Sequence, residues 1–245
     1  ARRNVDLGAD IIDINMGCPA KKVCNVLCGS ALLTDESLVA RILAAVASAV
    51  NVPVTLKTRT GWDRDHRNAV NIARIAEASG IAAIAVHGRT RADFYTGDAE
   101  YETIRSIKDS VRIPVIANGD IDTPAKARAV LDFTRADSVM IGRAAHGAPW
   151  IFRDVNGQIT SSKKITPLSR SARRDIILEH LDSLYAFYGE DTGVRVARKH
   201  LGWYLTKLQH GTELRRELMA AENSSLQFAL TRRGLDGWAD GKDAT

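Results

Sequence analysis

Cys18 is the residue best suited to chemistry, because it stands between Gly17 and Pro19 just after an apolar run. A thiol with an unperturbed pKa of about 8.5 is mostly protonated at neutral pH, so it can donate a proton as well as serve as a nucleophile. The alternative, a small buried apolar side chain, suits Cys28 better. The spacing of Cys18, Cys24 and Cys28 matches neither zinc-ribbon nor iron–sulfur ligands, so we predict no metal site.

Two further candidates are polar side chains within apolar runs. Lys57 lies two residues before Arg59 in VPVTLKTRTG (52–61), and a lysine in a buried strand needs an anionic partner. The alternative is a surface lysine with only its stem buried. His87 lies near the end of IAAIAVHGRT (81–90), and we expect it in the same layer as Lys57 on the next strand. The alternative is a histidine that only satisfies its own hydrogen bonds.

Two glycine motifs together indicate a phosphate site. ANGDI (117–121) and MIGRAA (140–145) each end an apolar run. Gly119 lets a phosphate approach the backbone closely, and Arg143 can add a forked, charged contact. The alternative is that the glycines only make tight turns after the strands.

Five apolar runs alternate with helical patterns and must position these residues. Each run predicts a strand buried on both faces of a parallel sheet, because its apolar residues do not alternate with polar ones. Helix caps are predicted at Thr34 or Asp35, at Gly80 and at Thr123-Pro124. Polar residues follow at every carboxyl end, which favours a (β/α)8 TIM-barrel type over a doubly wound sheet. The runs are 10–19, 52–61, 81–90, 113–122 and 137–145.

The pattern changes after Arg153, which separates two predicted domains. We predict five βα units of a partial barrel over 1–153, a linker rich in turn formers over 154–168, a small all-α domain over 169–235 and a flexible tail over 236–245. Helical spacing predicts helices over Arg170–Tyr188 and Val194–Gln209, with shorter ones near 212–220 and 224–231. A complete barrel takes about 250 residues, so we expect about 80 residues to precede Ala1 in the complete protein.

The composition is that of a globular protein, with 45% hydrophobic and 26% charged residues. No apolar run reaches the roughly 18 residues of a membrane span, and few cysteines without a leader sequence favour the cytoplasm. The chain is mildly basic, with 34 basic and 29 acidic residues. Basic clusters over 163–174 and 195–216 are either solvated helix faces or a surface that follows a phosphate backbone.

Seven motifs, taken in order, resemble the tRNA-dihydrouridine synthases, and the bacterial B-type subfamily most closely. The likeness covers about residues 1–235. The resemblance implies a βα barrel that binds FMN and a helical domain that binds tRNA. The motifs are NMGCPAKKV (15–23), GSALL (29–33), TLKTRTGWD (55–63), VHGRTR (86–91), ANGDI (117–121), IGRAA (141–145) and RKHLGWYL (198–205).

The resemblance also implies roles for individual residues. Cys18 would give a proton to C5 of a D-loop uridine, while reduced FMN delivers hydride to C6 and NADPH supplies the electrons. Lys57 would bind the flavin ring, and His87 would line the flavin and uracil pocket. We expect a cytoplasmic, monomeric enzyme. The residues that would hold the FMN ribityl phosphate are Asn118, Gly119, Asp120, Gly142 and Arg143, and the candidate substrate contacts are Asn15, Arg59 and Arg89.

The sequence departs from the family pattern in two places. Cys24 stands where the family usually has asparagine, and Asn25 or Val26 replaces a basic residue. The family's first barrel strands, with a Pro-Met turn and a flavin-binding glutamine, have no counterpart, so the five strands would correspond to strands 4 to 8 and we expect weak flavin retention by the chain as given. Two other functions stay open: an FMN barrel that reduces a small molecule, of the dihydroorotate dehydrogenase or ene-reductase kind, and a non-catalytic RNA-binding module.

Overall fold

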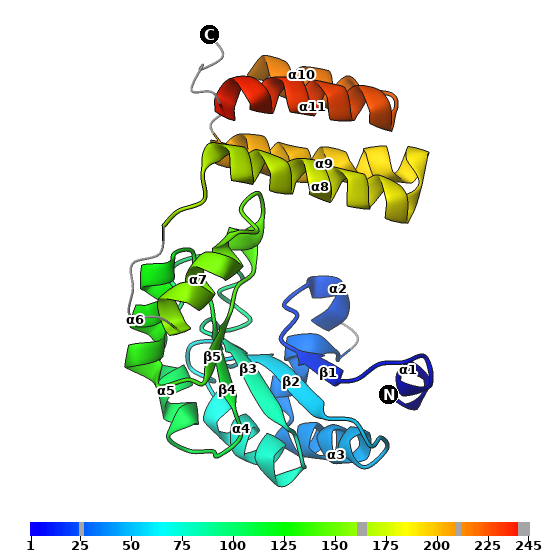
Figure 1. Cartoon of the computed structure of the whole chain (residues 1–245). Coiled ribbons are helices and arrows are strands. Elements are labelled where there is room, and N and C mark those ends of the chain that lie inside the picture. Colours follow the sequence, from blue (N-terminus) through cyan, green and yellow to red (C-terminus); the bar gives the residue numbers. More distant parts are fainter. Residues whose placement is uncertain (25–26, 161–165, 209–211, 240–245) are drawn as a thin grey trace. The chain divides into compact units, whose positions relative to one another are not determined.

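The chain forms two compact units in a computed structural model, Ala1–Gly142 and Arg143–Thr245. The structure describes residues 1–24, 27–160, 166–208 and 212–239 (Figure 1). Among these residues, no helix is both long enough and apolar enough to span a membrane. The predicted departure at Asn25 and Val26 lies outside the described residues.

The first unit is built on a five-stranded parallel sheet whose spatial order follows the sequence, β1-β2-β3-β4-β5. This order confirms the prediction of a TIM-barrel type of α/β fold, because in a doubly wound sheet the order of the strands reverses at a switch point. All five predicted runs contain a strand. Their bounds are β1 Ile12–Met16, β2 Val54–Arg59, β3 Ala83–His87, β4 Val115–Asn118 and β5 Ser138–Met140.

Helices connect the strands, as parallel pairing requires. Asp35 accepts a hydrogen bond from the Leu38 amide at the start of α3, and Thr123 caps α6 through the Lys126 amide. Gly80, with φ at +84°, follows α4. The helices of this unit are α1 Arg2–Asp6, α2 Lys21–Cys24, α3 Glu36–Ala47, α4 Ala69–Ala78, α5 Glu102–Lys108 and α6 Pro124–Thr134, with a 3₁₀ helix η1 at Gly29–Thr34.

The two faces of the sheet differ. The expectation of burial on both faces is right for β3, which is buried from Ile84 to His87, and wrong for the edge strands β1 and β5. Leu56, Ile84 and Val115 are fully buried on one face. Because side chains alternate along a strand, the other face carries residues such as Asn15 and Lys57. β1 and β5 alternate most clearly, since they lie at the edges of the sheet and expose every second residue. We call the face that carries Asn15 and Lys57 the polar face, and the candidate site residues on β1 to β4 lie on it.

The second unit is helical, as predicted. Leu181, Leu201 and Leu218 form one fully buried cluster, and Ile177, Tyr204 and Leu235 form another. Each cluster joins residues that are far apart in the sequence. The helices are α7 Ile151–Thr160, α8 Arg170–Tyr188, α9 Glu190–Leu208, α10 Thr212–Ala220 and α11 Ser224–Ala239, with a 3₁₀ helix η2 at Arg143–Ala145.

Two predicted irregular segments are partly helical. The linker expected over 154–168 is helical as far as Thr160, because Ile151 and Val155 bury one side of α7 despite the turn formers that follow them. Residues 161–165 lie outside the described residues. The tail expected over 236–245 continues α11 as far as Ala239, since Trp238 packs against the second cluster. Residues 240–245 again lie outside the described part of the chain.

Candidate active site

The polar face brings five of the predicted site residues together. Lys57 pairs with Asn15, while Arg59 pairs with His87 and His87 with Asn118. Lys57 and Arg59 are two residues apart on β2, so their side chains, and those of their cross-strand partners, point to the same face of the sheet. The prediction that His87 lies in the same layer as Lys57 is wrong. The register places Ala85 opposite Lys57, and His87 lies two residues further along β3, opposite Arg59.

Cys18 lies two residues after the end of β1, half-buried, at the carboxyl edge of the sheet. Its carbonyl accepts hydrogen bonds from the Ser30 amide at 3.1 Å and the Ser30 hydroxyl at 2.8 Å. The Cys24 thiol, which is buried, also points at this carbonyl, with 3.6 Å between Sγ and oxygen. The loop that carries Cys18 is thus held by the segment that begins at Gly29.

Lys57 is a partly buried cation with weak local compensation. Its Nζ donates one long hydrogen bond, 3.4 Å, to the Thr58 carbonyl. Burial, with the positive charge of Arg59 added, lowers the pKa of Lys57 to about 8. At neutral pH the ammonium remains mostly charged, and an anionic ligand on this face would pair with it.

His87 is held in the neutral form. Its residue is 7% exposed, and burial, followed by the charges of Arg59, Lys57 and Arg89, lowers the pKa of His87 to about 3. Its Nε2 lies 3.3 Å from Nη1 of Arg89, whose N–H can donate to a neutral imidazole. His87 can therefore exchange hydrogen bonds with a ligand without adding charge.

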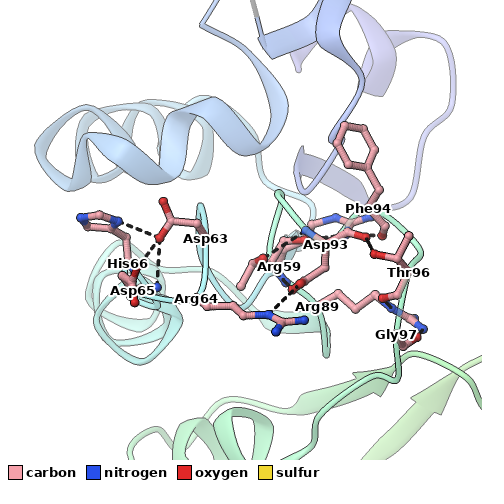
Figure 2. A network of polar contacts seen from close by, with 11 residues as sticks. Arg59, Asp63, Arg64, Asp65, His66, Arg89, Asp93, Phe94, Thr96 and Gly97 are labelled. Atoms are coloured by element: carbon pink, nitrogen blue, oxygen red, sulfur yellow. Dashed lines mark hydrogen bonds and ion pairs between the residues drawn. The ribbon is translucent and has the colours of Figure 1, made fainter.

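Arg59 and Arg89 are buried and bonded to backbone carbonyls (Figure 2). Arg59 donates to the carbonyls of Thr90 and Phe94 at 2.9 and 2.8 Å. Arg89 donates to the Thr96 carbonyl at 3.2 Å and also to the Gly97 carbonyl. With exposures of 2% and 3%, the two guanidinium groups hold the loop from 90 to 97, and their predicted contact with RNA stays a prediction.

The Gly119-Asp120 turn follows β4 in a conformation that favours glycine, with φ at +126° for Gly119 and +48° for Asp120. The Asp120 carboxylate takes two hydrogen bonds from Arg89, at 2.9 and 2.6 Å, and one from the Ala99 amide. Tyr101 donates to the Gly119 carbonyl at 2.6 Å. Because Asp120 is an anion already paired with Arg89, its side chain is unsuited to a phosphate, and only the backbone of the turn fits the predicted role.

Of the remaining predicted phosphate residues, Asn118 ends β4, whereas Gly142 and Arg143 lie where the first unit ends and the second begins. Asn118 donates from its side-chain amide to the Met140 carbonyl at 2.8 Å and so links β4 to β5. Gly142 is exposed, and a Cβ there would meet nothing within 4 Å. Arg143 begins the second unit. The joint phosphate site of the two glycine motifs therefore stays a prediction.

Sequence reasoning missed the residues that shape this edge of the sheet. Ser30 and Tyr101 act through the carbonyls of Cys18 and Gly119, and a hydroxyl that bonds a distant carbonyl leaves no pattern in the sequence. Ser30 lies in the GSALL motif, which was the one signal for it. Among the described residues, no group of three His, Cys, Asp or Glu side chains could hold a metal ion.

A parallel sheet in sequence order, with polar side chains at its carboxyl edge, is typical of βα-barrel proteins, the class to which this fold belongs. Residues 1–233 match the sequence model of the family described as Dihydrouridine synthase (Dus). The chain belongs to the dihydrouridine synthase family.

Relatives in three genera carry the same printed name, "tRNA-dihydrouridine synthase B". The Pseudomonas aeruginosa protein is 58% identical over 233 residues, which are 95% of this chain and 70% of that protein. The Xanthomonas axonopodis pv. citri protein is 60% identical over 236 residues, 96% of this chain and 71% of that one. The Klebsiella pneumoniae protein is 54% identical over 239 residues, 98% of this chain and 74% of that one.

Proposed function

We propose that this protein reduces a D-loop uridine of tRNA to 5,6-dihydrouridine, with Cys18 as the proton donor to C5. The observation that carries the proposal is the placement of Cys18 in a dihydrouridine synthase chain: a half-buried thiol in a braced loop, just after the strand that pairs with the strand of Lys57. A proton donor must sit within hydrogen-bond reach of the carbon it protonates, so a braced thiol serves better than a mobile one.

The residues of the polar face fit a flavin mononucleotide. Lys57 is a cation with one weak hydrogen bond, His87 is neutral, and Gly119 follows β4 with a φ of +126°, which favours glycine. Lys57 would hold the ring and favour negative charge on it, and the backbone of Gly119 would face the phosphate, with Asn118, Gly142 and Arg143 as further candidates. When bound, reduced FMN supplies the hydride that adds to C6, and NADPH supplies its electrons.

Asn15 is the candidate that can meet the uracil ring. It is exposed on the polar face, opposite Lys57, and its Oδ1 already accepts the Gly17 amide at 3.0 Å. That bond leaves the side-chain NH₂ to point elsewhere, so Asn15 can donate to a carbonyl oxygen of the base. His87 would border the same pocket as a neutral group, and this spares the pocket another positive charge.

The helical unit would bind the tRNA, with its exposed basic side chains in contact with the phosphate backbone. Exposed cations lie on α9 and α10, and Lys199 also stacks over the Trp203 ring at 5.0 Å. A loop uridine is turned out of its stack more cheaply than a base in a duplex, which suits a half-buried thiol donor. We further propose that the protein acts as a monomer in the cytoplasm. The exposed cations are Arg195, Lys199, Lys207, Arg215 and Arg216.

The test is dihydrouridine formation on unmodified tRNA by protein expressed from its complete gene, followed by nucleoside mass spectrometry. Cys18→Ala should lower the rate about 10²- to 10⁴-fold, because it removes the proton donor. Cys28→Ala is the matched control. The expectation that Cys28 is a small buried side chain is wrong, since Cys24 is the buried thiol and Cys28 is an exposed one, so its removal should leave the rate within about twofold. An undiminished rate for Cys18→Ala would contradict the proton-donor role.

The same assay separates the other two functions. An enzyme for a small molecule would keep its flavin but leave tRNA unreduced. A non-catalytic RNA-binding module would bind tRNA as a colourless protein, so a flavin absorbance band would dismiss it.

A further inference from the structure

The backbone around Cys18 is anchored on both sides of its Cα. On the preceding side, the Gly17 carbonyl accepts a hydrogen bond from Nε of Arg59 at 2.9 Å, and the Gly17 amide donates to Asn15 at 3.0 Å. On the following side, the Cys18 carbonyl accepts two hydrogen bonds from Ser30. Both peptide planes that meet at Cys18 are therefore fixed, and they determine φ and ψ of Cys18 and hence the direction of its Cα–Cβ bond.

Ser30 is placed for this contact by a close approach of two loops. Gly29, with φ at +60°, would carry a Cβ only 2.8 Å from the Cys18 carbonyl and 3.0 Å from its Cβ. The next residue, Ser30, is fully buried, with its amide and hydroxyl both aimed at the same oxygen. Loss of the hydroxyl would leave the amide as the remaining donor from Ser30 and let the carbonyl tilt.

Arg59 connects the Cys18 loop to a second loop. Its Nε holds Gly17, while Nη1 holds the carbonyls of Thr90 and Phe94 (Figure 2). A guanidinium can do this because its donors point in fixed directions in one plane, whereas a lysine ammonium is a point charge on a flexible stem. Arg59 is 2% exposed, and these backbone carbonyls are the partners of its guanidinium group.

We propose that Ser30 and Arg59 are positioning residues that aim the Cys18 thiol. The inference rests on the proposed function of Cys18 and gives Arg59 a role that does not require contact with the substrate. The two residues act through the carbonyls of Cys18 and Gly17. Each holds one peptide plane beside the Cys18 Cα, so that rotation about χ1 is the remaining way to move Sγ. A displacement of about 1 Å at a reacting group can reduce a rate about 100-fold, so this control has a measurable effect.

The test compares two variants with two matched controls in protein expressed from its complete gene. Ser30→Ala and Arg59→Lys are the test variants. Ser37→Ala removes a serine hydroxyl that bonds Asp35 on the exposed start of α3, and Arg64→Lys alters an exposed arginine that bonds Asp93 in the second loop. Circular dichroism melts of all four confirm that each variant is folded.

Steady-state kinetics supply the first readout. Ser30→Ala should lower kcat about tenfold and Arg59→Lys about 10- to 100-fold, with the KM for tRNA within about twofold of wild type. The controls should match wild type. A raised KM with unchanged kcat would overturn the proposal and return Arg59 to substrate binding. Equal kcat values for Ser30→Ala and Ser37→Ala would overturn it as well.

Alkylation of Cys18 by iodoacetamide, mapped by mass spectrometry, supplies a readout that needs neither flavin nor tRNA. Ser30→Ala should alkylate about fivefold faster at Cys18 than wild type, because an unanchored loop exposes the thiol more often. Ser37→Ala should not differ from wild type. If wild type makes no dihydrouridine, the proposed function fails, yet a faster reaction in Ser30→Ala alone would still support the anchoring. An unchanged alkylation rate would overturn it.

Discussion

The buried ion pair between Arg89 and Asp120 offers the sharpest prediction about the site's framework. Arg89 is 3% exposed, and its side chain donates twice to the Asp120 carboxylate and also to the carbonyls of Thr96 and Gly97. Arg89→Met keeps much of the volume but leaves Asp120 without its cation. Asp120→Asn keeps the shape and removes the negative charge.

The expected loss in the free energy of unfolding depends on which charged or polar group each substitution leaves unpaired. Removal of one partner of a buried pair destabilises by about 3–5 kcal/mol. The Asp120 side chain is 29% exposed, so water screens part of this, and we expect about 3 kcal/mol for Arg89→Met. Asp120→Asn should lose about 2 kcal/mol, since the amide oxygen still accepts a hydrogen bond. The double variant should lose about 3 kcal/mol rather than the sum of 5, because both changes break the same pair.

Hydrogen exchange followed by mass spectrometry is the assay, because it reports the opening free energy of peptides from the first unit by themselves. Peptides that cover 84–100 and 115–122 should lose protection in step with the values above. Arg64→Met is the matched control: its ion pair with Asp93 is drawn in the same network (Figure 2), but the Arg64 side chain is 73% exposed and the change should stay below about 0.5 kcal/mol. Equal effects for Arg89→Met and Arg64→Met, or additive losses in the double variant, would refute the reasoning.

Three further predictions concern the polar face. FMN affinity should be highest below pH 8 and fall as the pH rises through 8, because Lys57, with its pKa lowered to about 8, then loses the charge that attracts an anion. Fluorescence quenching of FMN measures this, and Lys57→Gln should bind more weakly at pH 7 with a flatter pH profile. Gly119→Ala should destabilise the first unit by about 2 kcal/mol and weaken FMN binding, because φ is +126° and the new Cβ would meet Ala99 at 2.7 Å; an unchanged melting temperature would contradict it. His87, with a pKa lowered to about 3, should show no imidazole titration by NMR between pH 5 and 8, and a titration midpoint within that range would contradict this prediction.

The strands and their carboxyl ends were predictable from the sequence, because apolar runs and their polar endings are local patterns. Asn15, Lys57 and Asn118 reach one face for that reason. Which residues lie opposite each other on neighbouring strands was less predictable. His87 was expected beside Lys57, but register depends on how far each helix shifts the next strand, and no local pattern records that shift.

The roles of Arg59 and Arg89 were not predictable for a different reason. Arginine is a typical surface and RNA-binding residue, and its burial depends on carbonyls supplied by loops far along the chain. The same holds for Ser30, whose partner Cys18 is twelve residues away. At the other end of the chain, α11 continues through residues expected to be frayed, because Trp238 finds a buried neighbour that its own segment does not contain.

The proposed reduction of tRNA uridine is tested most directly in cells. Nucleoside and fragment mass spectrometry of tRNA would compare three strains: one that lacks the gene, one re-supplied with it, and one re-supplied with the Cys18→Ala variant. We predict that one D-loop dihydrouridine is absent in the first, restored in the second and absent or strongly reduced in the third. The same dihydrouridine content in all three strains would contradict the account.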